Sequence, residues 1–400
     1  MSLVVSKFGG SSVADAGKIK NVARLVTDTY REGSDIVVVL SAQGDTTDEL
    51  IEKAREINPK ASRREMDMLL ANGEQISISL CAMAIEELGF PVISLTGWQA
   101  GMVTDTNHSN ARIKRIDSAR LSGELAKKNI VIVAGFQGIN KYDDITTLGR
   151  GGSDTTAVAL AASLGADVCR IYTDVDGVYT ADPRFVSGAR KLEEITYDEM
   201  LELASLGAQV LHNRSVELAK RYHVPLEVLS SFTGNKGTII KEVVKMEGMQ
   251  VSGVARDNNV ARISLTNLPD VPGIAFRTFS LLSQQKINVD IILQSIGRGD
   301  TKDISFTVAK NLVAPARELL ERHRGTLEYE DLIISENVAK VSIVGSGMVN
   351  NPGVAAKMFE ALFRAGVNIQ MISTSEIKVS VLIDAEQSDK AVAAIHEIFF

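Results

Sequence analysis

One segment of the chain occurs twice, and this internal repeat restricts the possible folds more than any other feature. Pro272–Ala275 (PGIA) recurs as Pro352–Ala355 (PGVA), an offset of 80 from position 272 to 352. Further identities follow at that offset: Phe279 and Phe359, Leu282 and Leu362, Asn288 and Asn368, Ser295 and Ser375. Two copies are too few to stack into a solenoid, so we expect a pair of small, similar domains. The alternative is chance similarity between two unrelated α/β segments.

Each copy has the same order of expected elements. A strand precedes the Pro-Gly turn, an amphipathic helix follows it, and two further strands complete the copy. The strands of the first copy are expected at Val260–Leu265, Val289–Leu293 and Ile304–Val308, and those of the second at Val338–Ile343, Ile369–Ile372 and Val379–Ile383, with a last helix at Ser388–Ile398. This order predicts two βαββαβ domains of the ferredoxin-like kind.

The first 240 residues have a different pattern, in which short apolar runs alternate with helical stretches. Most runs are continuously apolar, which is typical of strands buried on both faces of a parallel sheet. The expected strands are Leu3–Val5, Ile36–Leu40, Val92–Leu95, Ile130–Ala134, Val168–Tyr172 and Leu226–Leu229. Helices are expected at Ala14–Tyr30 and Thr155–Leu164. Alternating strands and helices predict an α/β sandwich.

Composition excludes several classes of protein. The 400 residues exceed what one hydrophobic core supports, so at least two domains are expected. A net charge of −7 is a poor electrostatic match for nucleic acid or anionic lipid. Two cysteines suggest neither a disulfide framework nor a zinc site. No apolar run approaches membrane-spanning length and no secretion signal is recognisable, so we expect no membrane partner and a cytoplasmic location. The histidines (His108, His212, His223, His323 and His396) show no metal-ligand spacing, so no protein-held metal is predicted.

Lys7–Ser12 (KFGGSS) directly follows the first apolar run and precedes a helix. Glycines at such a junction let backbone N–H groups approach a phosphate, and the helix N-terminus favours negative charge. A lysine at the strand end supplies a point charge for a phosphoryl group. The alternative is a tight turn with a solvated lysine.

Thr147–Thr156 (TLGRGGSDTT) opens the alanine-rich helix. Arg150 can hold a carboxylate with two parallel hydrogen bonds, and the glycines and Ser153 can offer backbone donors. Asp154 could orient the lysine or a metal-bound phosphate. The alternative is an N-cap with a flexible glycine hinge.

Thr173–Arg184 (TDVDGVYTADPR) follows an expected strand and therefore lies at the carboxyl edge of the sheet, where α/β proteins bind ligands. A plain turn is the alternative. The segment lacks the remaining ligands of an EF-hand loop.

These motifs together resemble those of the aspartate kinases, members of the amino-acid kinase superfamily with tandem C-terminal ACT domains. The resemblance spans essentially the whole chain and also includes Ser41–Gly44 (SAQG) and Phe136–Gly138 (FQG). It implies an α/β fold with an amino-acid kinase αβα sandwich and a mainly parallel central sheet, followed by two βαββαβ ACT domains. The implied limits are residues 1–245 for the kinase domain and 258–330 and 335–400 for the ACT domains, whose strands could interleave.

The implied activity is transfer of a phosphoryl group from ATP to the side-chain carboxylate of L-aspartate, the first step toward lysine, threonine and methionine. Mg²⁺ would be bound mainly through the ATP phosphates. The resemblance assigns Lys7 and Asp154 to catalysis. It assigns the nucleotide to Lys7, Phe8, Gly9, Gly10, Thr173, Asp174, Tyr179 and Arg184. It assigns aspartate to Ser41, Thr47, Glu74, Arg150, Gly151, Gly152, Ser153 and Asp154, with Glu74 meeting the ammonium group and Arg150 the α-carboxylate. Without the resemblance, Glu74 would be interpreted as a helix-surface carboxylate.

The ACT repeat implies amino-acid effector sites formed across a homodimer or larger assembly, with lysine, threonine or both as effectors. The implied residues of the first copy are Asp270, Gly273, Ile274, Ala275, Asn288, Val289, Asp290 and Gln294. Those of the second copy are Val354, Ala355, Asn368, Ile369, Ser375 and Glu376. The alternative is a constitutive dimerisation module.

One position departs from the family pattern, and two other functions stay open. Gln209 stands where many members carry a lysine near the nucleotide, so one ATP contact is in doubt. A kinase for glutamate, acetylglutamate, carbamate or UMP is the nearest alternative enzyme, and the KFGGSS run and the ACT pair disfavour it. A non-catalytic amino-acid sensor is the alternative from another class, and the presence of Lys7, Glu74, Arg150 and Asp154 argues against it.

Overall fold

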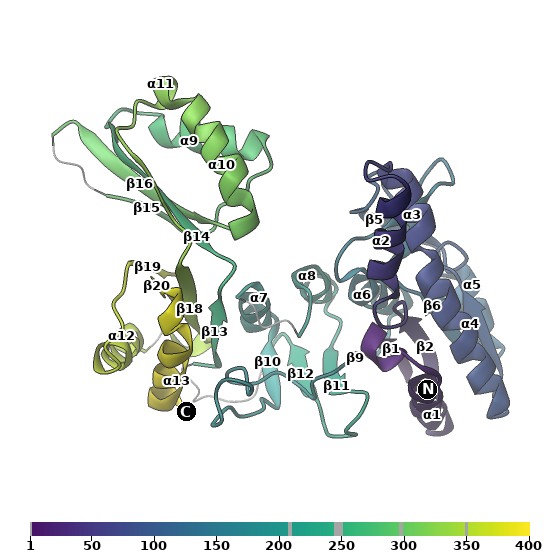
Figure 1. Ribbon diagram of the computed structural model, residues 1–400. Helices are drawn as coiled ribbons and strands as arrows, with labels where there is room; N and C mark the ends of the chain where they lie inside the picture. The colour runs from purple at the N-terminus through teal and green to yellow at the C-terminus, as the bar shows by residue number, and fades with distance from the viewer. Residues whose placement is uncertain (1, 207–209, 244–250, 296–298, 349–350) are drawn as a thin grey trace. The chain divides into compact units, whose positions relative to one another are not determined.

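The computed structural model describes residues 2–206, 210–243, 251–295, 299–348 and 351–400 (Figure 1). These residues form two compact units. The first unit contains the chain up to Tyr179, Lys191–Ser205 and 210–243. The second unit contains Thr180–Arg190, Leu206 and the chain from 251 to Phe400.

The first unit is built around an eight-stranded sheet in the order β10-β12-β11-β9-β1-β2-β6-β3. All neighbouring strands in it are parallel except β11 and β12. The bounds are β1 Leu3–Phe8, β2 Asp35–Leu40, β3 Val92–Leu95, β6 Ile130–Ala134, β9 Val168–Thr173, β10 Glu194–Thr196, β11 Leu226–Ser230 and β12 Thr238–Lys241. The mainly parallel sheet predicted from the continuous apolar runs is confirmed.

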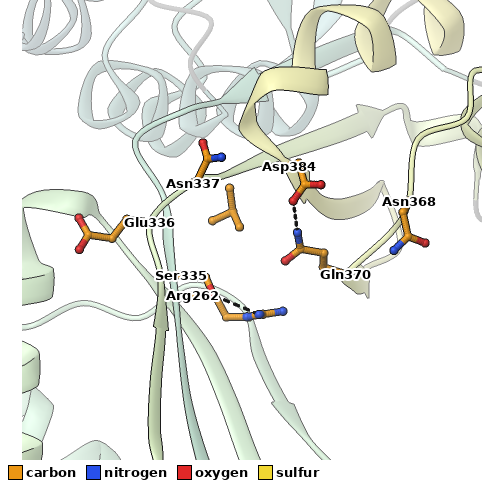
Figure 2. A pocket seen from close by; sticks show the side chains of 8 residues that line it. Arg262, Ser335, Glu336, Asn337, Asn368, Gln370 and Asp384 are labelled. Carbon is orange, nitrogen blue, oxygen red and sulfur yellow. Dashed lines mark hydrogen bonds between the residues drawn. The ribbon is translucent and has the colours of Figure 1, made fainter.

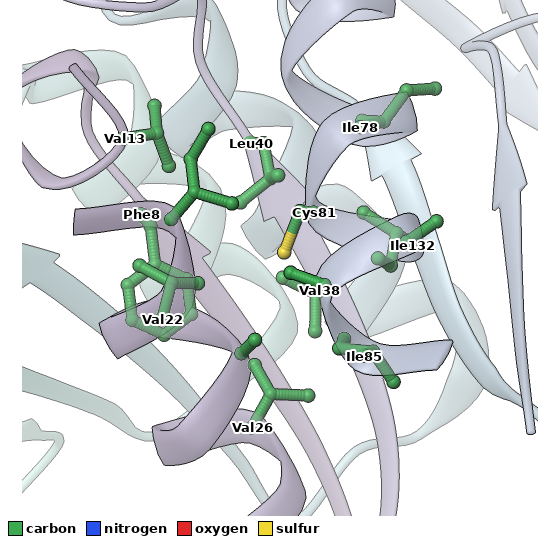
Figure 3. Packing of buried hydrophobic residues seen from close by; sticks show 14 of the residues in the cluster. Phe8, Val13, Val22, Val26, Val38, Leu40, Ile78, Cys81, Ile85 and Ile132 are labelled. Carbon is green, nitrogen blue, oxygen red and sulfur yellow. The ribbon is translucent and has the colours of Figure 1, made fainter. Parts of the chain in front are cut away.

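Helices cover both faces of this sheet, which gives the predicted αβα sandwich. On one face, α1 (Ala16–Arg31) and α4 (Asn72–Glu87) pack side chains such as Val22 and Ile85 against Val38 and Ile132 of the strands (Figure 3). Alternate strand residues point to the opposite face, where Val37, Val39, Val131 and Val133 are also fully buried. That face is covered by α6 (Gly152–Leu164), which contacts β1, β2 and β9.

A smaller four-stranded sheet, in the order β5-β4-β7-β8, completes the first unit. Its strands are β4 Met102–Thr104, β5 Ile113–Ile116, β7 Gln137–Ile139 and β8 Ile145–Thr147. The remaining helices are η1 Gly10–Ser12, α2 Thr46–Ile57, α3 Arg63–Leu70, α5 Ala119–Ala126, α7 Tyr197–Ser205 and α8 Asn213–Tyr222.

Among the described residues, Arg63–Glu87 is long and apolar enough to cross a membrane by length and composition. It comprises α3 and α4, and half of its most apolar window is buried inside the structure. Because α4 packs on α1, β3 and β6, this stretch is a core helix pair of the first unit.

The second unit contains two antiparallel four-stranded sheets, as the internal repeat predicts. The first copy forms the sheet β15-β16-β14-β17, and the second forms β13-β18-β20-β19. The bounds are β13 Gly253–Asp257, β14 Ala261–Pro269, α9 Ile274–Gln284, β15 Ile292–Gln294, β16 Thr301–Val308, η2 Lys310–Leu312, α10 Val313–Arg322, α11 Arg324–Leu327, β17 Leu332–Ser335, β18 Val338–Val344, η3 Ser346–Met348, α12 Val354–Arg364, β19 Met371–Thr374, β20 Lys378–Asp384, η4 Ala385–Gln387 and α13 Ser388–Phe399.

The edge strands of the two sheets differ from the simple repeat. β13 precedes the first copy in sequence but pairs with β18 of the second. β17 follows the helices of the first copy and pairs with β14. β15 begins at Ile292, three residues later than the strand expected at Val289. The limits 1–245, 258–330 and 335–400 therefore stay a prediction, with strand exchange between the copies as described.

Candidate active site

A pocket of about 290 Å³ lies at the carboxyl ends of the central strands, where ligands bind in open α/β sheets. Just beyond the strand ends, neighbouring chain segments are still joined by backbone hydrogen bonds. Ser41 N donates to Phe8 O (3.2 Å) and Gly135 N donates to Leu40 O (3.0 Å). The lining residues are Lys7, Gly10, Ser41, Ala42, Gly44, Thr47, Glu74, Phe136, Gly149, Arg150, Gly151, Gly152, Ser153 and Asp154. The structure thus brings together all eight residues predicted for the substrate, with Lys7 and Gly10.

Lys7 and Asp154 form an ion pair inside this pocket. Lys7 Nζ, from β1, lies 2.7 Å from Asp154 Oδ1 in the first turn of α6, and each side chain is 12% exposed. Two charges this close and this shielded hold one another in a fixed geometry. Lys7 Nζ therefore lies at the carboxyl edge of the sheet, beside the N-terminus of α6. That N-terminus itself favours a negatively charged ligand.

The backbone around Lys7 is packed too closely for a side chain. A Cβ added to Gly10 would lie 2.8 Å from Ala42 O and 3.1 Å from Gly44 O. These are backbone atoms of the loop that follows β2, so only glycine fits at this position. A glycine here also lets a ligand approach the backbone closely.

Glu74 is the chemically most unusual residue of the pocket. It lies in the first turn of α4 and is 3% exposed, so it is not the helix-surface carboxylate that its sequence alone suggests. Oε1 accepts a hydrogen bond from Ala42 N at 3.2 Å, whereas Oε2 has no hydrogen-bond partner among the described residues. Burial raises the pKa of Glu74 from 4.5 to about 8. A buried carboxylate oxygen facing a pocket calls for a cationic ligand group.

This raised pKa predicts how stability depends on pH. Between about pH 4.5 and 8 the folded chain keeps a proton that the unfolded chain has released, so the free energy of unfolding falls as pH rises. Replacing Glu74 by glutamine removes this contribution. We expect Glu74→Gln, without ligand, to melt at a higher temperature than the parent at pH 8.5 and to lose that advantage at pH 5. A difference that is equal at both pH values would contradict the assignment.

Arg150 offers the complementary charge in the same pocket. It follows Gly149 in the loop before α6, is exposed, and has no ion-pair partner in the part of the chain that the structure describes. Gly151 adopts φ +65° as the N-cap of α6, and an added Cβ there would meet His212 at 2.3 Å. Ser41 and Thr47, which follow β2, and Ser153 of α6 add hydroxyl groups to the lining of the same pocket.

The residues predicted for the nucleotide are more scattered. The side chain of Phe8 is 1% exposed and stacks on Tyr172 in the core, so only its backbone lies near the pocket. Gly9 donates its N–H to Tyr172 O at 3.3 Å. Thr173 donates to Asp174 at 2.9 Å, and Tyr179 donates to Asp176 at 2.8 Å, which raises the pKa of the Tyr179 phenol. The lining of the pocket includes none of the predicted residues Phe8, Gly9, Thr173, Asp174 and Tyr179.

Arg184 belongs to the second unit, where it pairs with Asp182 at 2.6 Å. Its role at the nucleotide stays a prediction. Gln209 lies outside the described residues.

Four lining residues were not among the predicted site residues: Ala42, Gly44, Phe136 and Gly149. Three adopt positive φ angles, which for Phe136 (φ 69°) is unusual in a residue with a side chain. Their motifs, SAQG, FQG and TLGRGG, are visible in the sequence. Nothing in the sequence, however, shows that these turns meet at one edge of the sheet.

The predicted effector residues fall into several places within one chain. A pocket of about 380 Å³ at the first Pro-Gly turn is lined by Asp270–Ala275 and by Lys302, which pairs with Asp270 at 2.6 Å and was not predicted. A second pocket, of about 610 Å³, lies between the two sheets and is lined by Arg262, Ser335, Glu336, Asn337, Val338, Asn368, Gln370 and Asp384 (Figure 2).

The prediction placed the Pro-Gly turn residues and the asparagine of one ACT copy in the same effector site. Neither of these two pockets contains both from one copy. Gly273, Ile274 and Ala275 line the first pocket, while Asp290 pairs with Lys340 and Gln294 lies on β15. In the second copy Asn368 lines the other pocket, whereas Val354 and Ala355 lie in the first turn of α12. The other predicted effector residues line neither of these two pockets: Asn288 and Val289 of the first copy, and Ile369, Ser375 and Glu376 of the second.

Comparisons with known proteins agree with this architecture. Residues 2–230 match the amino acid kinase family, and residues 263–323 and 341–399 match the ACT domain. Over 400 residues the chain is 51% identical to an aspartokinase of Bacillus sp. (strain MGA3), covering 100% of this chain and 97% of that protein.

Solved structures give the same picture. The chain is similar to aspartokinase III of E. coli in complex with aspartate and ADP (R-state), with 26% identity, a TM-score of 0.83 and 100% of both chains covered. It is also similar to aspartokinase III of E. coli in complex with lysine and aspartate (T-state), with 27% identity and a TM-score of 0.76, covering 100% of this chain and 99% of that one.

Proposed function

The chain belongs to the aspartokinases, amino acid kinases that carry ACT domains, and from this premise we propose how its pocket works. The chain is an aspartate kinase, and we propose that it transfers the γ-phosphoryl group of ATP to the side-chain carboxylate of L-aspartate. The product would be 4-phospho-L-aspartate. The observation that carries the proposal is the buried Glu74 oxygen, which has no hydrogen-bond partner within the described parts of the chain and lies in the same pocket as Arg150 and the Lys7–Asp154 pair.

Aspartate fits this pocket through its two α-substituents. Its ammonium group pairs with Glu74, which is then held as the carboxylate, and its α-carboxylate pairs with the guanidinium of Arg150. The hydroxyl groups of Ser41, Thr47 and Ser153 and the backbone donors of Gly151 and Gly152 surround the amino acid. The side-chain carboxylate is then directed toward Lys7, at the end of the pocket where Gly10 lies and where the phosphates would bind.

The reaction needs no general base, because a carboxylate is already ionised at pH 7. One of its oxygens forms a bond to the γ-phosphorus while the bond to the bridging oxygen breaks, and ADP leaves with that electron pair. The main obstacle is repulsion between two anions. Lys7 and the N–H groups at the start of α6 reduce it by stabilising negative charge, and Asp154 keeps Lys7 in place.

The pocket residues fit an Mg²⁺ ion that ATP carries on its own phosphates. At the phosphate end the lining provides one carboxylate, Asp154, and Lys7 already holds it. When bound, the ion would neutralise charge on the phosphates.

We further propose that the reaction is the first step of a cytoplasmic route to lysine and threonine. Lysine, threonine or both would inhibit the enzyme at the ACT domains of a homodimer or larger assembly. The E. coli structure in complex with lysine and aspartate supports an amino-acid effector. The pocket at Asp270–Ala275 is a suitable part of such a site, because it combines a helix N-terminus with the charges of Asp270 and Lys302. Since the predicted turn residues and asparagines do not share a pocket within one chain, a second chain would complete the site.

The direct test is formation of acyl phosphate, trapped by hydroxylamine as the hydroxamate, with ATP, Mg²⁺ and either aspartate or glutamate. We expect turnover with aspartate, little with glutamate, and a lower rate when millimolar lysine plus threonine is added. Turnover unaffected by these amino acids would overturn the effector proposal and favour a constitutive dimerisation module. Nucleotide binding without product from either substrate would favour the sensor alternative.

A further inference from the structure

Asp67 is a buried carboxylate that lies outside the pocket and has no part in the proposed reaction. It lies on α3 and is 0% exposed. Its two oxygens accept hydrogen bonds from Thr147 Oγ1 (2.7 Å), Thr147 N (3.1 Å) and Ser109 N (2.9 and 3.0 Å), and His108 Nδ1 lies at 3.1 Å. A carboxylate is buried this deeply only when such donors replace its water. Asp67 therefore fastens two segments distant in the sequence to one another.

Both segments lead to the wall of the pocket that carries Arg150. Thr147 is the last residue of β8, and Gly149 and Arg150 follow it by two and three positions. Ser109 reaches the same wall from its other side, because a Cβ added to Gly149 would lie 3.1 Å from Ser109 O. One buried carboxylate thus fixes the backbone on both sides of Gly149.

The conformation of Ser109 requires this support. Its φ angle is 68°, in the left-handed region that residues with a side chain seldom adopt. Both oxygens of Asp67 accept its N–H. A backbone in this region persists when its surroundings impose it, so loss of the acceptor should let this turn relax.

Arg214 of α8 holds the same two segments by their carbonyl groups. Its Nη1 donates to Leu148 O at 2.9 Å and its Nη2 donates to Ala111 O at 2.8 Å. The wall is therefore fixed twice, by a carboxylate that accepts from its N–H groups and by a guanidinium that donates to its C=O groups.

We infer that Asp67 is a positioning residue for aspartate binding: it sets the place of Arg150 without touching the substrate. This inference rests on the proposed function, because it assigns Arg150 to the α-carboxylate of aspartate. Loss of Asp67 should weaken the binding of aspartate and leave ATP binding intact, because Lys7 and Gly10 lie on β1 and the turn after it, which make none of the hydrogen bonds to Asp67 described above.

Asp67→Asn tests this directly, since it keeps the size of the side chain but turns one acceptor into a donor that faces N–H groups. We expect the KM for aspartate to rise about tenfold or more, with the KM for ATP within about twofold of the parent value. Asp144→Asn is the matched control, because Asp144 pairs with Arg64 of the same helix at the surface (3.0 Å) and should leave both constants unchanged.

Thr147→Val and Thr147→Ser keep the test valid if Asp67→Asn does not fold. Valine has the shape of threonine but loses the hydroxyl donor, whereas serine retains it, so only valine should raise the KM for aspartate. An unchanged KM for aspartate in both Asp67→Asn and Thr147→Val, or equal rises for aspartate and ATP, would overturn the inference. A parent enzyme without turnover on aspartate would instead refute the proposed function.

Discussion

Replacing Lys7 by methionine is expected to lower kcat for acyl phosphate formation by about 10²–10³-fold, the loss typical of removing one preorganised charge-stabilising donor. Methionine keeps the length of the lysine stem and removes its charge. Lys7 Nζ lies 2.7 Å from Asp154 in the first turn of α6. Without it, the attacking carboxylate meets the γ-phosphate with its repulsion uncompensated. Hydroxamate formation under saturating ATP and aspartate measures this loss.

Two controls separate charge stabilisation from a failure to fold. Lys20→Met removes an exposed lysine that pairs with Glu87 at 3.2 Å, and it should leave kcat unchanged. Lys7→Met also leaves Asp154 without its cation, so the double variant Lys7→Met/Asp154→Asn restores the charge balance. We expect the double variant to regain thermal stability but not activity. A single variant with at least a third of the parent kcat would contradict the role of Lys7.

Replacing Glu74 by glutamine is expected to raise the KM for aspartate about 10²-fold, since losing one partner of a buried charge pair typically costs 2–5 kcal/mol. The effect should depend on pH. The pKa of Glu74 is about 8 before substrate binds, and only its ionised form attracts an ammonium group. In the parent, kcat/KM for aspartate should therefore rise with pH up to about 8, and in the variant this rise should be absent.

Glu86→Gln serves as the control for this prediction, because Glu86 lies on the same helix and is exposed. It should change neither the KM for aspartate nor its pH dependence. A Glu74→Gln variant that keeps the rise of kcat/KM with pH would show that another group titrates, and the assignment of the ammonium to Glu74 would then be wrong.

The strands of the first unit could be predicted from the sequence because burial on both faces leaves continuous apolar runs. β2 and β6 occupy Asp35–Leu40 and Ile130–Ala134, within one residue of the expected limits. The start of α6 was less predictable. Gly151 and Gly152 are poor helix formers, yet Gly151 caps the helix with φ +65° and the first turn begins at Gly152, three residues before the expected start.

The pairing of strands that are distant in the sequence could not be predicted from local sequence patterns. β13 is a short strand whose sequence gives no sign that it joins the second ACT sheet instead of the first. The segment Thr173–Arg184 looks like one motif, but its first part belongs to the first unit and Arg184 to the second. Strand exchange and unit boundaries depend on which surfaces meet in three dimensions, which local sequence does not encode.

The site divides in the same way. Lys7, Arg150 and Asp154 belong to the glycine-rich segments Lys7–Ser12 and Thr147–Thr156, whose composition indicates phosphate and carboxylate binding. Asp67 lies among methionines and charged residues of an ordinary amphipathic helix, and only the fold reveals that it is fully buried and holds the Arg150 wall. Glu74 is intermediate. The family resemblance assigns it, and the structure supplies the physical reason, a buried carboxylate oxygen that accepts no hydrogen bond from any residue that the structure describes.

The central claim is that Glu74 selects the ammonium group of the substrate, and succinate tests it most directly because it is aspartate without that group. The measurement is the ratio of kcat/KM for aspartate to that for succinate, in the parent and in Glu74→Gln, from hydroxamate formation at pH 8. We expect this ratio to be about 10² or more in the parent. In Glu74→Gln we expect it to be smaller by a factor of about ten or more. An equal preference in both proteins would contradict the claim and place recognition of the ammonium group elsewhere in the pocket.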